Sequence, residues 1–436
     1  MTVATGSAVS GRPKPHALLV VENCSVPLDR RVWNQARTVA DAGYDVTVIS
    51  PVGRKAGDVA RREHRDGVDI IRFPMPFGGP RKIDFLFEYG WAVLAVHWLA
   101  IRLWRRKPFD VIHVANPPDL FFGLKWLFGR RGARFVFDQH DLGPETYQSK
   151  FDEERSDAFA RLLGWLERRS YRAADAVIVT NESYRERAVG RGEMPDDAVF
   201  TVRNSPDLEL FRPRQPTPSL KGGHAHMVVF VGTMGHQDGV HVLLEAADHV
   251  RRVRGRTDVL FAIVGTGDAW DRLQELHRTL ELGVGVRFTG FIPDDEMLDY
   301  LATADVGAAP DVDSPLNNIS TMIKTMDYMA MGLPLVSFDL IESRVSAGDA
   351  AIYAEEHTGA SFGAAILELI DDPERRAEMA RRGRDRIDGP LSWRHSAAGL
   401  LAAYRRARGL QRPLRALDDP VDERGFDSSD TAAELA

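Results

Sequence analysis

Cysteine is almost absent from this chain of 436 residues, in which Cys24 is the only one. A single cysteine excludes an intramolecular disulfide and a cysteine metal cluster, so a reducing cytoplasm is the natural setting. No apolar segment of the secretory type precedes the first strand-like run, and residues 1–15 read as a flexible polar arm. We therefore expect a cytoplasmic protein.

An excess of positive charge is also absent, since 56 Lys and Arg residues stand against 63 Asp and Glu residues, a net charge of −7. This balance excludes a chain whose bulk surface coats nucleic acid, and we expect no nucleic acid partner. No G-K-[ST] phosphate loop occurs, and no GxGxxG follows the first strand-like run. The second absence disfavours an NAD dehydrogenase.

Short apolar runs alternate with helical patterns along the chain, which predicts two α/β domains with mostly parallel sheets. Residues 206–225 are rich in Pro, Gly and charge and are the predicted linker. The predicted domains are residues 16–205 and 226–390, followed by a packed helix within 391–411 and an acidic tail at 412–436. The strand-like runs are HALLVVE, YDVTVIS, FDVIHVAN, ARFVFDQH and ADAVIVTN, then MVVFVGT, VLFAIVGTG, VRFTGFIP, ADVGAAP and LPLVSFD.

One segment, residues 315–334, combines helix signals with groups that suit a phosphate. Ser320 is the predicted N-cap, and Gly332 is the predicted stop. At about 100° per residue Ser320, Lys324 and Asp327 share one face, and a helix N-terminus beside a lysine suits a diphosphate by dipole and by charge. The alternative is an ordinary surface helix with a Lys324–Asp327 ion pair.

Three glycine-containing loops follow strand-like runs of the second domain, at the ends where open α/β sheets bind ligands. The loop 231–240 is a phosphate-loop candidate, because its glycines permit close backbone approach to a ligand. The loops 264–268 and 290–293 are candidates to wall a nucleotide base, and each of the three loops has an alternative interpretation as a plain turn. The candidate ligand-binding residues here are Gly232, Thr233, Gly235, Gly239, Gly265, Gly267 and Phe291.

Polar side chains also gather at the end of a first-domain run, FVFDQHDLGPE, which contains Asp138, His140, Asp141 and Glu145. Polar groups bunched at the carboxyl end of a strand are often functional. A metal site is disfavoured, because a histidine and a glutamate in one loop lack a second ligand set elsewhere. The alternative is that each carboxylate solvates the loop or caps a helix.

Residues 85–107 form the most apolar stretch, FLFEYGWAVLAVHWLAIRLWRRK, yet only 13 residues separate Glu88 from Arg102. That length falls short of the roughly 20 residues that a membrane-spanning helix needs. The tryptophans and the C-terminal cations fit a helix lying on an anionic membrane surface. Packing against the first domain's sheet is an equally open interpretation, and both hold if they use different faces.

Three segments in this order resemble retaining glycosyltransferases of the GT-B fold, in particular family 4 and its bacterial branch for lipopolysaccharide, capsule and exopolysaccharide sugars. They are VENCSVPLDRRVWNQARTVADAGYDVTVISP, VGTMGHQDGV and STMIKTMDYMAMGLP, and the similarity runs from about residue 16 to residue 404. The resemblance implies two Rossmann-like domains facing across a cleft, with a nucleotide sugar held mainly by the second. It also implies retention of the anomeric configuration, no bound metal and no cofactor besides the donor substrate.

The resemblance assigns roles to particular positions. His140 matches the first-domain histidine near the donor sugar, and Asp327 takes the place of the second glutamate of the Glu-x7-Glu motif, which contacts the ribose. The loop 232–239 approaches the diphosphate, and the helix around 393–404 crosses back onto the first domain. The candidates on the acceptor side are Asp29, Arg30, Asp141 and Glu145.

The chain departs from the family pattern in the donor-binding segments. Thr233 and Asp238 stand where many members carry Arg and Lys, and Ile319 stands at the first glutamate. Lys324 is the candidate substitute for the missing cations. These departures leave an inactive homologue open as an alternative.

Four further residues accompany Lys324 in this interpretation. Ser320 and Thr321 are expected to bind the diphosphate with it, at the helix N-terminus. Asn317 and Asn318 are expected to replace the missing glutamate toward sugar hydroxyls, since amides both donate and accept hydrogen bonds.

The resulting hypothesis is a glycosyltransferase, cytoplasmic or peripheral to the inner face of the plasma membrane. It moves a sugar from a nucleotide-diphosphate donor to a lipid-linked or glycan acceptor in cell-surface polysaccharide synthesis, with His140, Lys324 and Asp327 as the catalytic candidates. Two alternatives stay open: a GT-B sugar-nucleotide epimerase, and a non-catalytic scaffold of a polysaccharide assembly complex.

Overall fold

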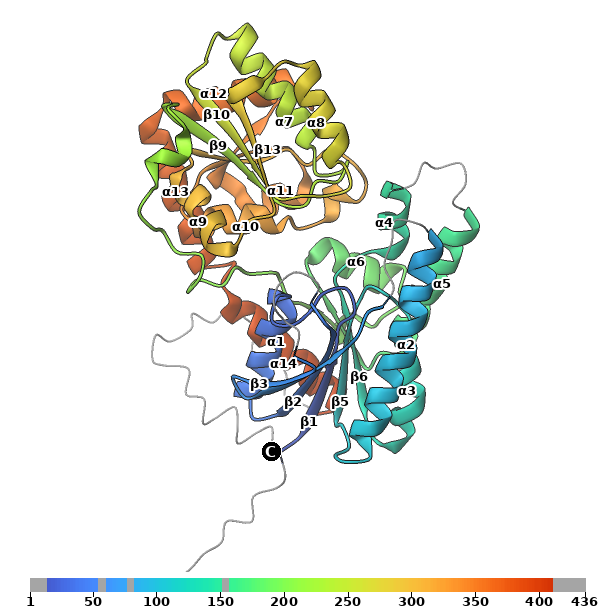
Figure 1. The fold of residues 1–436 in the computed structure, drawn as a ribbon. Coiled ribbons are helices and arrows are strands. Elements are labelled where there is room, and N and C mark those ends of the chain that lie inside the picture. The colour runs from blue at the N-terminus through green and yellow to red at the C-terminus, as the bar shows by residue number, and fades with distance from the viewer. Residues whose placement is uncertain (1–13, 54–59, 77–81, 151–156, 411–436) are drawn as a thin grey trace, which may run out of the picture.

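The computed structural model describes residues 14–53, 60–76, 82–150 and 157–410 (Figure 1). The predicted acidic tail and nearly all of the predicted N-terminal arm lie outside these residues. Two α/β domains follow one another along the chain, as the alternation of strand-like runs and helices predicted.

The first domain contains an eight-stranded sheet in the order β3-β4-β2-β1-β5-β6-β7-β8. Neighbouring strands are parallel except for β3 and β4, which are antiparallel at one edge. The strands are β1 (His16–Val20), β2 (Asp45–Pro51), β3 (Arg62–Arg65), β4 (Val68–Phe73), β5 (Val111–Ala115), β6 (Arg134–Gln139), β7 (Ala176–Val179) and β8 (Val199–Thr201). The helices are α1 (Arg30–Asp41), α2 (Lys82–Trp104), α3 (Gly123–Phe128), α4 (Gly143–Lys150), α5 (Asp157–Ala173) and α6 (Glu182–Gly190).

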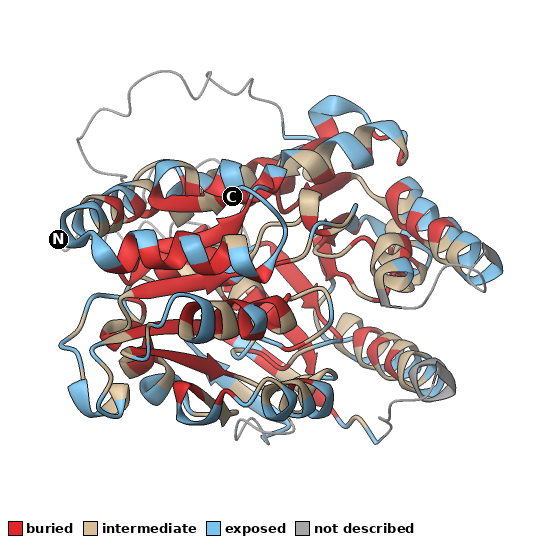
Figure 2. Cartoon of the chain, turned by 90° about the horizontal axis from the view of Figure 1, so that it is seen from above, coloured by how far each residue is buried: buried red, intermediate tan, exposed pale blue. Residues whose placement is uncertain are grey.

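Helices cover both faces of this sheet, because its central strands are buried on both sides. α2, α3, α5 and α6 contribute to one core cluster, and α1 contributes to the cluster on the opposite face. In Figure 2 the helices show buried residues toward the strands and exposed residues on the outside. This burial follows from the runs of Val, Ile, Leu and Phe in β1, β2, β5 and β6.

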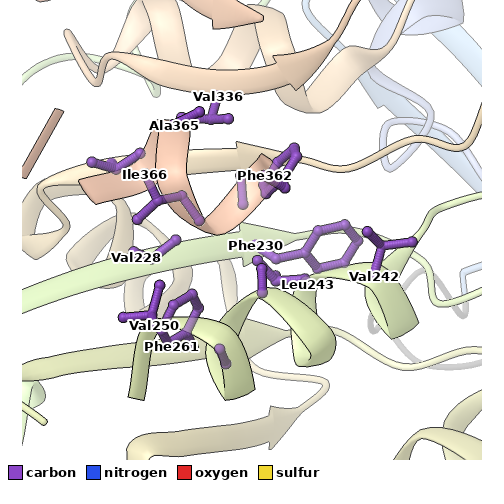
Figure 3. Close-up of a cluster of buried hydrophobic side chains, with 14 of the residues drawn as sticks. Val228, Phe230, Val242, Leu243, Val250, Phe261, Val336, Phe362, Ala365 and Ile366 are labelled. Atoms are coloured by element: carbon purple, nitrogen blue, oxygen red, sulfur yellow. The ribbon is translucent and has the colours of Figure 1, made fainter. Parts of the chain in front are cut away.

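The second domain has a six-stranded parallel sheet in the order β11-β10-β9-β12-β13-β14. Its strands are β9 (His226–Val231), β10 (Val259–Val264), β11 (Val286–Gly290), β12 (Val306–Ala309), β13 (Leu335–Phe338) and β14 (Ala351–Ala354). Its helices are α7 (Val240–Asp248), α8 (Trp270–Thr279), α9 (Asp294–Thr303), α10 (Ile323–Ala330), α11 (Ile341–Ala347), α12 (Gly359–Asp371) and α13 (Pro373–Asp388). Figure 3 shows the core on one face, where Phe230 of β9 lies among side chains of α7 and α12.

A last helix, α14 (Trp393–Arg408), returns to the first domain. Leu400, Leu401 and Tyr404 are buried in the same cluster as α1 and β1. The Trp393 indole nitrogen donates a hydrogen bond to the Thr38 hydroxyl at 2.9 Å, and the Tyr404 hydroxyl lies 3.0 Å from Nδ1 of His113. The last helix of the chain is therefore part of the first domain's core.

The segment between the domains packs against the second domain instead of running free. Phe211 is fully buried in a second-domain cluster, and the backbone nitrogen of Thr217 donates to the Thr303 hydroxyl at 2.8 Å. Four strands were missed by the sequence analysis: β3, β4, β8 and β14. β3 (REHR) is an exposed edge strand made of charged residues, so it carries no apolar signal.

Helix α2 contains most of the apolar segment 85–107, for which packing on the sheet and lying on a membrane surface were both predicted. Ala92, Val96 and Ala100 are fully buried on the sheet, while Leu94 and Trp98 are exposed. The helix is thus packed along one side, as one interpretation predicted. In the part of the chain that the structure describes, no helix is both long enough and apolar enough to cross a bilayer.

Candidate functional site

The candidate site lies where the carboxyl ends of the strands of both sheets meet. Arg30, at the start of α1, forms an ion pair of 3.0 Å with Asp294, at the start of α9, and its guanidinium lies 4.7 Å from the ring centroid of Phe211. The Tyr184 hydroxyl, in the first turn of α6, is 3.2 Å from the Ser320 hydroxyl after β12. Ligands of open α/β sheets bind at these strand ends, and the two contacts join residues that follow strands of different sheets.

His140 follows β6 and is held by a buried carboxylate. Its Nε2 lies 2.7 Å from Oδ2 of Asp138, which is fully buried and also receives hydrogen bonds from Arg31 at 2.8 Å and from Gln35 at 2.7 Å. Burial by itself raises the pKa of Asp138, but the charges of Arg31 and His140 and the hydrogen bonds of two histidines outweigh it and hold that pKa well below its ordinary value. An ionised carboxylate only accepts hydrogen bonds, so Nε2 of His140 carries the proton of this contact, and Nδ1 is the ring nitrogen left to face a ligand.

Asn116, which the sequence analysis did not single out, holds the His140 loop in place. Its Oδ1 accepts hydrogen bonds from the backbone nitrogens of His140 (2.6 Å) and Asp141 (3.1 Å). Its Nδ2 donates to the Asp141 carbonyl (2.8 Å) and to Oδ1 of Asp119 (3.1 Å). The side chain therefore uses two donors and two acceptor sites at once. Its position directly after the run VIHVA was the available signal.

Asp119, which accepts the hydrogen bond from the Asn116 side chain, is a buried carboxyl with an unusual pKa. Burial raises the pKa of Asp119 to about 8, the negative charge of Glu167 adds to the effect, and the hydrogen bond from Asn116 opposes it. Near neutral pH the group is therefore mostly protonated and uncharged. A neutral carboxyl can accept from Asn116 without placing a bare charge in the core.

The four acceptor-side candidates have different surroundings. Asp29 caps α1 by accepting a hydrogen bond from the Val32 nitrogen at 3.0 Å, and Arg30 reaches the second domain as described. The backbone of Asp141 is fixed by Asn116. Glu145 forms an ion pair of 2.6 Å with Arg191, which also pairs with buried Glu167 at 2.7 Å, so its carboxylate belongs to a first-domain network.

The predicted helix cap at Ser320 is wrong. Helix α10 begins at Ile323, and residues 317–319 form a short separate turn whose preceding carbonyl, that of Leu316, accepts the Ser320 hydroxyl at 2.8 Å. The predicted stop is confirmed, because Gly332 has a φ of 68°, in the left-handed region that ends helices.

Lys324 lies in an acidic cluster and not beside Asp327. Its ammonium donates a hydrogen bond to Asp311, lies 3.6 Å from Oδ1 of Asp238 and is 5.3 Å from the ring centroid of Phe230. Lys324 and Asp311 are both buried, and Oδ2 of Asp311 accepts no hydrogen bond among the described residues. The Lys324–Asp327 ion pair of the alternative interpretation is therefore wrong.

Asp327 is close to the contact between the domains. Burial raises the pKa of Asp327 to about 7, while the positive charge of Arg30 lowers it and the negative charge of Asp294 raises it. The Asp327 carboxyl therefore titrates near neutral pH, and the charge of Arg30 in the first domain lowers its pKa.

The glycine loops of the second domain pack against one another. A Cβ on Gly265 would lie 2.0 Å from the Gly232 carbonyl oxygen, and a Cβ on Gly239, where φ is 66°, would lie 1.7 Å from the Pro310 carbonyl oxygen. The glycines thus let the loops after β9, β10 and β12 pack backbone against backbone, and their approach to a ligand stays a prediction. Of the remaining candidates there, Phe291 is exposed.

The polar residues between β12 and α10 are bound to protein groups. Nδ2 of Asn317 donates to the carbonyls of Gln237 (2.9 Å) and Val312 (2.8 Å), and Nδ2 of Asn318 donates to Asp313. The Thr321 hydroxyl accepts from Nδ2 of Asn181 at 3.0 Å, across the domain boundary. The two asparagines thus hold the loop that presents Lys324.

Clusters of metal-binding side chains are not found among the described residues. Within the ranges of the chain that the structure describes, no three His, Cys, Asp or Glu side chains are arranged to hold a metal ion.

Comparison with known proteins agrees with this geometry. Residues 28–205 match the family described as a glycosyl transferase 4-like domain, and residues 225–372 match glycosyl transferases group 1. Both domains of this chain are glycosyltransferase domains. The first matched range contains the strands of the eight-stranded sheet except β1, and the second contains the six-stranded sheet.

The similarity to known proteins covers nearly the whole chain. The D-inositol 3-phosphate glycosyltransferase 1 of Catenulispora acidiphila is 25% identical, over 93% of this chain and 98% of the relative. Sucrose-phosphate synthase of Thermosynechococcus elongatus has a TM-score of 0.74 at 17% identity, covering 92% of this chain and 100% of that one. Anabaena HepE in complex with UDP and glucose has a TM-score of 0.66 at 14% identity, covering 89% and 99%. These structures show that the fold is GT-B, whereas the matches do not single out the surface-polysaccharide branch.

Proposed function

We propose that the protein transfers a sugar from a nucleotide-diphosphate donor to a lipid-linked or glycan acceptor in cell-surface polysaccharide synthesis, with retention at the anomeric carbon. The observation that carries the proposal is the placement of Lys324 and His140 at the facing strand ends of two glycosyltransferase domains. The similar proteins include an inositol phosphate glycosyltransferase and HepE with bound UDP and glucose, and both support a sugar donor of this class.

The diphosphate of the donor replaces two carboxylates as the ion-pair partner of Lys324. The charge of Lys324 is shared by Asp311 and Asp238. A diphosphate brings two negative charges and several acceptor oxygens, and it competes for the same ammonium. Burial raises the pKa of Asp311 and the Lys324 charge opposes this, so loss of Lys324 to the diphosphate favours protonation of Asp311. Proton uptake then offsets the repulsion between donor and carboxylate.

The transfer step is a front-face displacement. The bond from the anomeric carbon to the diphosphate oxygen breaks, the acceptor hydroxyl oxygen bonds to the same face of that carbon, and the hydroxyl proton passes to the departing phosphate oxygen. Lys324 stabilises the negative charge that develops on that oxygen. His140, oriented by Asp138, presents its second ring nitrogen, Nδ1, toward a hydroxyl of the donor sugar. The proposed step uses neither a bound metal nor a cofactor.

Donor screening tests the function directly. Purified protein is melted with UDP-, GDP- and ADP-sugars, and the stabilising donor is incubated with candidate acceptors while the product anomer is identified by NMR. A ligand that binds only the native state raises its stability, so one donor is expected to raise Tm and to give a product with the donor's anomeric configuration. Conversion of donor to an epimer without acceptor favours the epimerase alternative, and the lack of any nucleotide effect favours the scaffold.

A further inference from the structure

Exposed apolar side chains concentrate on one side of the first domain. Half of the large apolar side chains that are exposed in the described residues lie on α2, α3 and α5, including every exposed tryptophan of that part of the chain. The three helices bury their inner sides in one cluster on the same sheet face, so their outer sides point the same way (Figure 1). This outer face consists of Phe87, Leu94, Trp98, Trp126, Leu127, Phe159, Leu162 and Trp165.

Positive charge surrounds these apolar residues, although the chain as a whole is acidic. Among the described side chains of the three helices the only carboxylates are Glu88 and Glu167, and Glu167 is buried against Arg191. Arginines stack on two of the tryptophans, Arg102 at 5.5 Å from the Trp98 ring and Arg169 at 4.9 Å from the Trp165 ring. The exposed arginines on or next to the outer face are Arg102, Arg105, Arg106, Arg130, Arg131, Arg161, Arg168, Arg169 and Arg172.

A hollow of about 490 Å³ adjoins the outer face between β4 and α2. Its wall includes Phe73 and Leu99 together with Leu94 and Trp98 of the outer face, and Arg61 and Arg102 also line it. An apolar wall with arginines suits a hydrocarbon chain that carries an anionic head group. β4 ends beside this hollow, at the same sheet edge as the candidate site.

We propose that the outer face docks the first domain on an anionic lipid bilayer and that a lipid hydrocarbon chain enters the hollow. Tryptophans lie at the head-group level of bilayers, and arginines beside them bind lipid phosphates. A second copy of this chain brings the same positive charge to the contact, so self-association through this face is opposed. Docking holds the strand ends of the first domain near a lipid-borne acceptor, but it does not depend on the proposed transfer.

Vesicle co-sedimentation of the full chain tests the docking. Vesicles of phosphatidylcholine with phosphatidylglycerol are compared with vesicles of phosphatidylcholine alone, at low and high salt. We expect binding only to the anionic vesicles, weakened by salt, because surface charges are screened. Changing Arg161, Arg168 and Arg169 together to Glu, or Trp98, Trp126 and Trp165 together to Ser, is expected to lower the partition coefficient at least about tenfold.

Matched controls come from the second domain. Exposed Arg375, Arg381 and Arg382 on α13, changed together to Glu, alter the charge equally but leave the outer face intact, so binding is expected to persist. All variants change exposed residues, and unchanged unfolding midpoints verify their folding. Equal binding to neutral vesicles, undiminished binding of the arginine variant, or a wild-type dimer that Trp126→Ser dissociates would overturn the proposal.

Discussion

At the scale of single residues, Lys324 carries the greatest predicted effect. Lys324→Ala removes the cation from the diphosphate site and leaves Asp311 and Asp238 to repel the donor, so we expect donor affinity to fall by at least about tenfold, with a parallel loss of turnover. Isothermal titration with the stabilising donor and steady-state kinetics measure both quantities. Unchanged affinity would remove Lys324 from the diphosphate site.

The same change also tests the fold, because it leaves a buried carboxylate unpaired. Breaking a buried ion pair costs about 3–5 kcal/mol, so Lys324→Ala is expected to lower the free energy of unfolding by an amount of that order. The double variant with Asp311→Asn removes the orphan charge and is expected to recover most of that stability without recovering donor binding. Separate loss and recovery distinguish the structural role from the role in binding.

Asn116 is predicted to be a positioning residue for His140. Asn116→Ala leaves the backbone nitrogens of His140 and Asp141 without their acceptor, so the loop relaxes and the free energy of unfolding falls by about 1–3 kcal/mol. We expect kcat to fall while donor affinity changes little, because the diphosphate site belongs to the other domain. Equal losses in both quantities would contradict a role confined to the His140 loop.

The buried carboxyl of Asp119 predicts a pH dependence of stability with a definite sign. Its pKa is raised to about 8 in the folded protein, so the folded state holds a proton that the unfolded chain releases above about pH 4. The stabilising contribution is complete below that pH and declines as the pH rises toward 8. Denaturant unfolding between about pH 5 and pH 8 is expected to show this decline, and Asp119→Asn is expected to make it shallower, while the raised pKa of Asp327 retains part of it. If Asp119→Asn has the same pH dependence of unfolding free energy as the wild type, the proton is bound at another group.

At the scale of elements, α14 shows how a distant segment completes a domain. Leu400 of α14 is fully buried against the first domain's sheet, whereas Leu410 beyond the helix is 40% exposed. Leu400→Ala is expected to cost about 2–5 kcal/mol of unfolding free energy, and Leu410→Ala less than about 0.5 kcal/mol. Chemical denaturation of the two variants checks the difference, and similar values would mean that α14 is dispensable for the first domain.

At the scale of the whole molecule, polar contacts between described residues of the two domains include Glu342 as a shared acceptor. Glu342, after β13, accepts a hydrogen bond from the Ser183 hydroxyl at 2.8 Å and lies 3.4 Å from Arg203. Interfaces of this kind permit domain motion. Glu342→Ala is expected to widen the distribution of domain separations in small-angle X-ray scattering while each domain stays folded. An unchanged scattering profile would show that other contacts hold the domains together.

Much of the fold was predictable because strands buried on both faces leave continuous apolar runs in the sequence. Ten such runs became strands, whereas β3 escaped notice because an exposed edge strand made of Arg, Glu and His carries no apolar pattern. The start of α10 was misplaced for a related reason. A serine before a helical run signals a cap, but the Ser320 hydroxyl bonds to Leu316 within a preceding turn that no periodicity reveals.

The sequence by itself determined the two α/β domains and the loops that carry the candidate chemistry, because burial periodicity and loop residues are local properties. Only the tertiary structure decided the partners of those residues. Asp311 lies 13 positions before Lys324, and Asn116 lies 24 positions before His140. The folding of neighbouring parallel strands brings their carboxyl ends together, and it is this non-local pairing that sets the charge and protonation of the site.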